Sequence, residues 1–354
     1  MKLGAIPQNP LELAALAGGF VPTPILDTLI ALLLARSVLT GAKLGIFDAL
    51  AGGPLPVAEV AARCATDPRA TEKLLNALTG AGYLRFAEGR YRLASVARKW
   101  LLKDAPGSLY DAVLLQLLDA EFVEHCEDYV RTGVPVDMHA GLTTEQWDLY
   151  QRGMRAGANL AAAEVARRVF VPRNATDMLD IGGAHGYYSV ALCRRHPQLR
   201  ATILDLPEAV AASAPLLARE GMGERVAHRA GDALTADLGR DAYDLVLIAN
   251  LVHHFDDATN RALVQRAADA LRPGGLLVIG EVIRPRVPGD GGQLGALTDL
   301  YFAITSESGT WSFAEMAAWQ RAAGLRPRRP LRLLTGPGAG LQIATKPKLE
   351  GTQS

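Results

Sequence analysis

The chain has 354 residues, of which 49% are hydrophobic and 21% are charged. This length exceeds that of an average domain and predicts two domains with sizeable cores. The 37 basic and 37 acidic side chains cancel, so no overall field favours nucleic acid or an anionic membrane as a partner.

The sequence carries no sign of export or of membrane insertion. One lysine, two prolines and a glutamate interrupt the first 20 residues, where a signal peptide needs a continuous apolar stretch. The most apolar run, LIALLLA at 29–35, is shorter than the roughly 20 residues that span a bilayer. Three cysteines far apart in sequence argue against both a disulfide framework and a zinc site. We expect a cytoplasmic protein.

Residues 1–105 are expected to form a mostly helical first domain. The stretch 24–50 places apolar residues around most of a helix surface, which requires burial on more than one side and suggests a second subunit. Residues 55–94 then read as two short helices and a hairpin, the outline of a winged helix. The second helix, at about 70–80, offers only Lys73 as a base, with Glu72 beside it. A dimerisation module is therefore favoured over a DNA reader.

Residues 106–172 are expected to be a helical linker that lines a substrate site, and 347–354 a disordered tail. Between them, residues 173–346 alternate short apolar strands with helical stretches. This alternation predicts an α/β fold with a doubly wound, mostly parallel sheet. The strands are expected at 177–183, 201–206, 225–232, 243–250 and 276–283, and the helices between them at 186–196, 207–220 and 257–275.

In such a sheet the ligand lies beyond the carboxyl ends of the strands. The first strand ends in DIGGAHG, residues 180–186, which contains glycines for a tight turn but no G-x-G-x-x-G fingerprint. This weakens an NAD or FAD interpretation. Asp180 repels a pyrophosphate but can accept hydrogen bonds from a cationic or neutral nucleoside. Asp205 follows the second strand, where it can take the hydroxyls of a ribose, and Asp232 follows the third, where it suits an exocyclic amine such as that of adenine.

The segments LDIGGAHGYYSVAL, ILDLPEAV, GDAL, LIANLVHHFDD and LRPGGLLVIGEVI together resemble the S-adenosylmethionine-dependent small-molecule O-methyltransferases that carry an N-terminal winged-helix dimerisation domain. ARSVLTGAKLGIFDAL and YRLASVARKWL resemble that N-terminal domain, so the resemblance covers nearly the whole chain. It implies a Rossmann-like methyltransferase sheet with an antiparallel last strand, a homodimer and the cofactor S-adenosylmethionine, released as S-adenosylhomocysteine. The cofactor-binding residues that it implies are Asp180, Gly182, Gly186, Asp205, Leu206, Gly231, Asp232, Ala233 and Asn250.

The resemblance also implies a general base. The family's histidine stands two places before an aromatic residue, which selects His253, and His254 then occupies the place usually held by an acid. Glu281 matches a carboxylate that flanks the base. A phenol of pKa about 10 needs such a base at neutral pH, and imidazole suits the task. We expect His254 to point away from the base position, into the pocket wall or toward the helix that follows. A metal bound by HHFDD is not expected, because successive residues project in different directions.

The acceptor pocket is expected to be apolar and aromatic, although aromatic residues at helical spacing are as often core. The sequence departs from the family at Ala184, in place of a glycine, where we expect a negative φ, and at His185. It also has Thr310 where a second flanking glutamate is usual. The pocket residues expected are Trp147, Tyr150, Met154, Asn250, Tyr301 and Phe302, with Trp311 nearby.

The leading hypothesis is a dimeric methyltransferase that acts on a hydroxyl of a small aromatic or polyketide-like metabolite. An alternative keeps the fold and the cofactor but transfers the methyl group to carbon or nitrogen, or uses the cofactor without methyl transfer. A distant alternative is a winged-helix regulator that senses a nucleoside and binds DNA.

Overall fold

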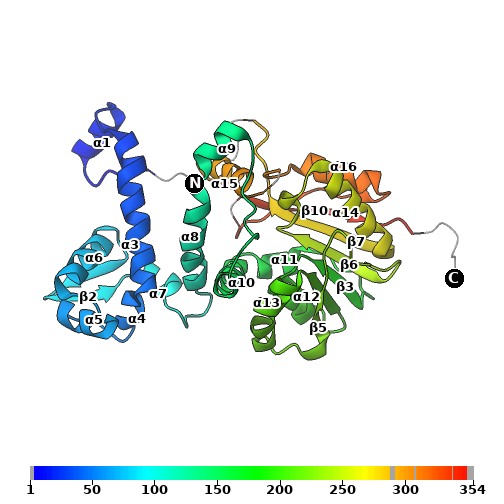
Figure 1. The fold of residues 1–354 in the computed structure, drawn as a ribbon, viewed down its shortest axis with the longest axis horizontal. Coiled ribbons are helices and arrows are strands. Elements are labelled where there is room, and N and C mark those ends of the chain that lie inside the picture. The colour runs from blue at the N-terminus through cyan, green and yellow to red at the C-terminus, as the bar shows by residue number, and fades with distance from the viewer. Residues whose placement is uncertain (1–3, 288–291, 307, 337, 349–354) are drawn as a thin grey trace. The chain divides into compact units, whose positions relative to one another are not determined.

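The computed structural model describes residues 4–287, 292–306, 308–336 and 338–348. The chain divides into two compact units, residues 1–117 and 118–354. The segment 106–172 is shared between them, because helix α8 (Tyr110–Val123) crosses the division. Each unit is described by itself below (Figure 1).

The first unit has the expected helix–helix–hairpin outline. Helices α5 and α6 precede two antiparallel strands in which Leu84 pairs with Leu93. Asp67 caps α6 by accepting the backbone N–H of Ala70 at 2.8 Å. The core is formed by fully buried side chains of α4, α6 and the hairpin, among them Phe47. The elements are α1 (Pro10–Ala17), α2 (Thr23–Ile25), the π-helical η1 (Leu26–Ile30), α3 (Ala31–Lys43), α4 (Ile46–Ala49), α5 (Val57–Cys64), α6 (Pro68–Gly80), β1 (Leu84–Ala87), β2 (Arg90–Leu93) and α7 (Ser95–Trp100).

The stretch Thr23–Lys43 is continuously helical and has an apolar surface. It contains 21 residues with a mean hydropathy of 1.7, and so it is long and apolar enough to cross a membrane by those two measures. The expectation that this stretch is too short is wrong, because the helix extends beyond LIALLLA in both directions. Length and hydropathy alone do not distinguish a membrane span from a helix that packs on another protein. Leu29, Leu32 and Leu33 are each more than half exposed in the single chain, which indicates a surface that needs a cover.

The second unit contains the expected sheet and the helices around it. Its helices are the end of α8, α9 (Cys126–Thr132), α10 (Thr144–Ala158), α11 (Ala162–Arg168), α12 (Tyr187–Arg195), α13 (Pro207–Arg219), α14 (Asp257–Ala270), α15 (Gly292–Thr305) and α16 (Phe313–Ala322), with short 3₁₀ turns η2 (Gly223–Arg225) and η3 (Val252–His254). Its strands are β3 (Asp177–Ile181), β4 (Arg200–Asp205), β5 (Val226–Ala230), β6 (Tyr243–Ala249), β7 (Leu271–Val282), β8 (Arg326–Pro327), β9 (Leu331–Arg332) and β10 (Ala339–Thr345).

The described strands of the second unit form one sheet in the order β5-β4-β3-β6-β7-β10-β8, with β9 paired to β10. Strands β3 to β7 are parallel and β10 is antiparallel to β7, as expected. The chain starts in the middle of the sheet at β3, runs outward to β5 and returns to β6. The order therefore reverses between β3 and β6, and this is where a doubly wound sheet forms its ligand crevice.

Both faces of the sheet are covered by helices, which explains why its central strands are mainly apolar (Figure 1). On one face Met178 and Ile203 pack against residues of α11, α12 and α13, including Val190. On the other, Leu179 packs with residues of α14 and α16, including Trp319. Successive residues of a strand thus enter opposite cores. The sheet is held from both sides, and its loops at the carboxyl edge are free to carry a site.

The expected helix 257–275 is wrong at its end. Asp256 caps α14 by accepting the backbone N–H of Thr259 at 2.7 Å, but the helix stops at Ala270. Leu271 already pairs with Tyr243 of β6, and Gly274 has a φ of 87°. Pro273 and the left-handed glycine end the helical pattern five residues before the strand was expected to begin.

Candidate active site

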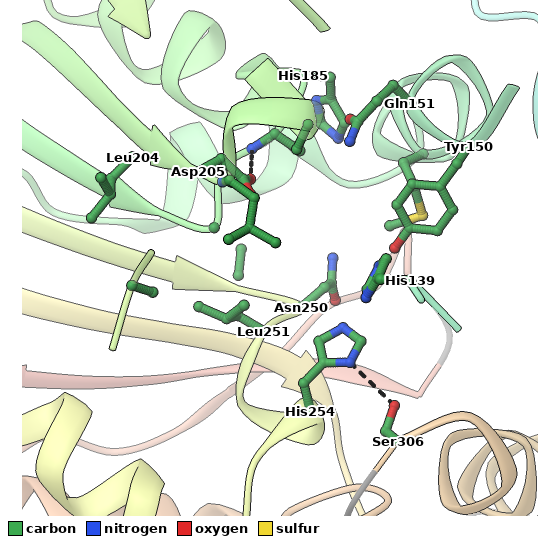
Figure 2. A pocket seen from close by; sticks show the side chains of 18 of the residues that line it. His139, Tyr150, Gln151, His185, Leu204, Asp205, Asn250, Leu251, His254 and Ser306 are labelled. Atoms are coloured by element: carbon green, nitrogen blue, oxygen red, sulfur yellow. Dashed lines mark hydrogen bonds between the residues drawn. The ribbon is translucent and has the colours of Figure 1, made fainter. Parts of the chain in front are cut away.

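A cavity of about 490 Å³ opens beyond the carboxyl ends of β3, β4 and β6. Loops after these strands form one part of its lining, and residues of α10, of the loop before it and of the end of α15 form the rest (Figure 2). The residues expected from the sequence that line it are Asp180, Gly182, Asp205, Leu206, Asp232, Ala233, Asn250, Trp147, Tyr150 and Met154. The cavity thus brings together residues from segments more than 100 positions apart.

The loop after β3 has the tight turn that its glycines suggested. Gly182 has a φ of 68° and Gly186 a φ of 70°, which favour glycine. A Cβ on Gly183 would lie 2.5 Å from the Asp180 carboxyl carbon, so only glycine fits there. Gly186 begins α12 and lies outside the cavity lining. The loop is thereby folded back over the Asp180 side chain.

The expectation of a negative φ at Ala184 is wrong, since its φ is 43°. Two long-range hydrogen bonds hold this strained residue. Its N–H donates to the Asp205 carboxylate at 2.7 Å, and the ring nitrogen Nε2 of His228 lies 2.8 Å from its carbonyl oxygen. A local preference of alanine is therefore overridden by contacts with β4 and β5.

Asp180 is the most perturbed acid in the cavity. Its side chain is 1% exposed, and Oδ2 accepts the Ser189 hydroxyl at 2.6 Å. Oδ1 is buried and has no hydrogen-bond partner among the described residues. Burial raises the pKa of Asp180 to about 7, against the Ser189 hydrogen bond that lowers it. A buried carboxylate oxygen without a partner fits a cationic or hydrogen-bond-donating ligand group.

Asp205 and Asp232 stand after the next two strands. Asp205 accepts the N–H groups of Leu206 and Ala184, and burial raises its pKa in spite of these bonds. Asp232 accepts the Leu234 N–H at 2.8 Å. Gly231 lies behind the lining, with its N–H on the Asp205 carbonyl at 2.8 Å. The three expected acids thus converge on one cavity from three strand ends.

His253 and Glu281 form a buried pair. Nδ1 of His253 lies 3.1 Å from both carboxylate oxygens of Glu281, and the side chains are 4% and 1% exposed. The parallel register of β6 and β7, which opposes Ala249 to Gly280, places the two residues side by side. Glu281 also accepts the Val252 N–H at 3.0 Å, which fixes the carboxylate. Neither side chain is part of the cavity lining, whereas His254 is.

His254 lies in the pocket wall, one of the two places expected for it. The 3₁₀ turn η3 breaks the alternation of the strand, and the His254 ring lies in the cavity wall with Nδ1 3.3 Å from the Ser306 hydroxyl (Figure 2). Its ring centroid is 4.1 Å from that of His253 and 5.0 Å from that of His139. In the part of the chain that the structure describes, no group of three or more His, Cys, Asp and Glu side chains is arranged to hold a metal.

The aromatic residues divide between cavity and core. Trp147 and Tyr150 line the cavity with Met154. Phe302 lies outside the lining and stacks on His253, with ring centroids 4.1 Å apart. Tyr301 also lies outside the lining and donates to Asp119 at 2.8 Å. Trp311, offered as a neighbour of the pocket, is 7% exposed and donates its indole N–H to the Val252 carbonyl at 2.9 Å, which supports the turn that carries His253.

No acid stands at Thr310, but a carboxylate reaches that position from α15. Both the N–H and the hydroxyl of Thr310 donate to Asp299. The acid therefore holds the segment after α15, on which Ser306 lies.

Several lining residues were missed by sequence reasoning. His139 stacks on Trp147, with ring centroids 5.5 Å and planes 9° apart, but it lies in an irregular loop with no local pattern to signal it. Gln151 has a buried Oε1 without a described partner and lies beside His185 (Figure 2). Tyr188 pairs with the Asn250 side chain. Gln151 could have been found, since it is one residue from Tyr150 on α10.

Comparison with known proteins follows the same division of the chain. A family model described as an O-methyltransferase domain matches residues 118–326, and a model described as an O-methyltransferase dimerisation domain matches 26–103. The chain belongs to the O-methyltransferase family. The family uses S-adenosylmethionine as the methyl donor.

This O-methyltransferase is similar to two curated bacterial enzymes along most of its length. It is 28% identical to the 3-hydroxy-5-methyl-1-naphthoate 3-O-methyltransferase of Streptomyces sahachiroi, with 91% of this chain and 94% of that enzyme covered. It is also 28% identical to the tetracenomycin polyketide synthesis 8-O-methyl transferase of Streptomyces glaucescens, with 92% and 97% covered. The solved structure of human N-acetylserotonin methyltransferase with SAM has a TM-score of 0.78 at 21% identity, with 97% and 99% covered, and shows the same fold.

Proposed function

We propose that this O-methyltransferase transfers a methyl group to a phenolic hydroxyl of a small aromatic or polyketide-like metabolite, with His253 as the general base. The observation that carries the proposal is the buried His253–Glu281 pair beside a cavity that is lined by three acids at strand ends. The named substrates of the two Streptomyces relatives support an aromatic acceptor. Trp147 and Tyr150 give the cavity an aromatic wall suited to a planar molecule.

The cavity has the donor and acceptor groups that the cofactor requires. When bound, S-adenosylmethionine supplies a methyl group on a positively charged sulfur. The partnerless oxygen of Asp180 fits the ammonium group of the methionine part, and Gly182 and Gly183 line the cavity beside it. Asp205 suits ribose hydroxyls and Asp232 an adenine amine. The residues that would hold it are Asp180, Gly182, Gly183, Asp205, Leu206, Asp232, Ala233 and Asn250.

The His253–Glu281 geometry selects one ring nitrogen as the proton acceptor. With the carboxylate on Nδ1, the neutral ring carries its proton there and leaves the lone pair on Nε2. Nε2 hydrogen-bonds to none of the described residues. It is also absent from the fully buried polar atoms without a partner, so part of its surface is exposed. A phenol proton can therefore pass to Nε2, and Glu281 then stabilises the imidazolium.

We also propose that the chain works as a homodimer through its N-terminal unit. The match to a dimerisation domain begins at residue 26, within the apolar helix. Apolar side chains on both sides of that point are exposed in the single chain, from Leu11 and Phe20 to Leu33. A second copy would remove this surface from water, which favours association.

The proposed location is the cytoplasm, as expected from the cysteines. Cys64, Cys126 and Cys193 are all free thiols in the structure. Free thiols persist in a reducing compartment.

The proposal is tested with S-adenosylmethionine that carries a deuterated methyl group, a panel of phenols, and mass spectrometry of the products. The expected product is an aryl methyl ether. His253→Ala should lower kcat about 10²–10⁴-fold with cofactor binding unchanged, and His125→Ala, which changes an exposed histidine, is the matched control. Full activity of His253→Ala would refute the base, and a C-methyl or N-methyl product would refute O-methylation.

A further inference from the structure

The cavity lining has a one-sided charge. Four carboxylates line it, from Asp137, Asp180, Asp205 and Asp232, while no lysine or arginine does so among the residues that the structure describes. Asp180, Asp205 and Asp232 lie at the strand ends, in the part proposed for the cofactor. The remaining part is here called the acceptor half, and it is formed by Pro135, Val136, Asp137, His139, Trp147, Tyr150, Gln151, Met154, His254, Thr305 and Ser306. It holds one acid, Asp137, and no described cation.

Imidazole rings form one wall of the acceptor half. His139 is stacked on Trp147 and tilted against His254, and the His254 ring in turn contacts the His253 ring. In Figure 2 the His254 ring lies below Asn250, and the His139 ring lies beside Asn250, on the side toward Tyr150. The Nδ1 edge of His254 is engaged by Ser306, so the opposite edge of the ring is the one presented to the cavity (Figure 2).

These rings do not replace the missing cation. Burial lowers the pKa of His254 well below its usual value, and the nearby His253 and His139 lower it further. Burial also lowers the pKa of His139, with a smaller contribution from His253, although Asp137 opposes this. Both rings are therefore neutral at physiological pH. An anionic acceptor would meet neutral imidazoles and the Asp137 carboxylate, with no cationic side chain among the described lining residues to pair with it. Burial of a carboxylate without such a partner is strongly disfavoured.

We propose that the acceptor is an uncharged aromatic molecule, and that His254 hydrogen-bonds to a polar substituent beside the reacting hydroxyl. This inference rests on the proposed methyl transfer and adds the charge class of the substrate. His254 is suited to the task because it adjoins His253 in sequence and in space, so a group bound to its cavity edge lies next to the proton that His253 removes. A neutral ring can donate to a carbonyl or accept from a hydroxyl. An acid at this position could only accept.

The first test compares two acceptors that differ in one charge, 3-hydroxy-1-naphthoate and its methyl ester, at pH 8. Binding of each to the complex of the protein with S-adenosylhomocysteine is measured by calorimetry, and turnover by mass spectrometry. We expect the ester to bind at least 100-fold more tightly than the acid. We also expect its kcat/KM to be at least 100-fold higher. Equal or tighter binding of the acid would overturn the inference. Binding of the ester without methylation would instead count against the proposed function alone, so the two failures are distinguishable.

The second test supplies the missing cation. His139→Arg should reduce the ester-to-acid ratio at least tenfold, while His139→Gln, which stays neutral, should keep it. Loss of the ratio in both variants would contradict the electrostatic reason.

A third test concerns His254. His254→Ala should raise KM for acceptors with a carbonyl beside the hydroxyl and leave KM for unsubstituted phenols within threefold. His254→Gln should restore part of the loss. An equal rise in both KM values would refute the role of His254, and unchanged affinity for S-adenosylhomocysteine in all variants controls for folding.

Discussion

We predict that the ionised form of Asp180, which is the form that binds the cofactor, lowers the stability of the ligand-free protein. The pKa of Asp180 is raised from 3.8 to about 7, which means that the folded state holds the proton more tightly than the unfolded chain. Between about pH 4 and pH 7 the folded state binds more protons, so this residue's contribution to stability falls as pH rises through that window. At pH 8 the ionised group is disfavoured by about 4 kcal/mol, at 1.36 kcal/mol for each unit of pKa.

Asp180→Asn removes that charge and keeps the shape. The amide still accepts the Ser189 hydroxyl, but its NH₂ group lacks a described partner, which costs about 1–3 kcal/mol. We expect Asp180→Asn to be more stable than the wild type at pH 8 by about 1–3 kcal/mol, or by roughly 2–10 °C in Tm. The gain should shrink by about 2–3 kcal/mol between pH 8 and pH 5, because the wild-type carboxyl is then protonated in the folded state.

The assay is urea unfolding of both proteins at pH 5 and pH 8 without ligand, with calorimetric binding of S-adenosylmethionine beside it. Asp180→Asn should bind the cofactor about 10–100-fold more weakly at pH 8, as expected for the loss of a charged hydrogen bond. Wild-type affinity should fall about tenfold from pH 8 to pH 6, and the variant should lack this dependence. Asp148→Asn, at a half-exposed acid paired with Arg152, is the control. A stability difference that is the same at both pH values would refute the reasoning.

Three further predictions concern other contacts. Glu281→Gln should lower kcat about 10²–10⁴-fold with cofactor affinity unchanged in calorimetry, because the imidazolium loses its partner; a loss below tenfold would contradict the pairing. His228→Phe should weaken cofactor binding about 2–10-fold through the freed carbonyl of Ala184, and the effect should be smaller in an Ala184→Gly background, where the left-handed backbone costs nothing; equal effects in both backgrounds would argue against strain. Burial acts to raise the pKa of Glu164, but the hydrogen bonds that its carboxylate accepts, above all from the Thr335 hydroxyl, outweigh burial and lower the pKa to about 2. The stability that Glu164 provides should be complete above about pH 4.5 and lost as pH falls toward 2, and Glu164→Gln should remove this dependence and about 2–4 kcal/mol in urea unfolding at pH 7.

The residues that could be found from the sequence are those fixed by strand ends. Asp180, Asp205 and Asp232 follow three apolar runs, and a parallel sheet brings the carboxyl ends of its strands to one edge whatever the loops do. The pairing of His253 with Glu281 follows from the same geometry, since His253 lies just past the end of β6 and Glu281 lies in the neighbouring strand β7, one position before its end. In each case a local pattern and a general property of sheets were sufficient.

Side-chain directions outside regular elements could not be found in this way. For His254 the sequence left the pocket wall and the following helix as alternatives, because the 3₁₀ turn at 252–254 ends the alternation of side chains along the strand. His139 lies in a loop whose path depends on contacts with distant residues. Tyr301 and Phe302 have the composition of a binding site, yet only the packing of α15 decides that one donates to Asp119 and the other stacks on His253.

Part of the backbone strain in this chain lies where the sheet order reverses. Five described residues other than glycine have a positive φ, and the two that line the cavity, Ala184 and Asn250, follow the two strands that flank the reversal, β3 and β6. Such a conformation costs about 1–3 kcal/mol and persists only where neighbours impose it. Asn250 is held by its N–H on the Gly280 carbonyl at 2.8 Å, and Ala184 by Asp205 and His228. The shape of the cavity is therefore set from β4, β5 and β7, so substitutions of these neighbours should disturb cofactor binding more than replacement of Ala184 by glycine does.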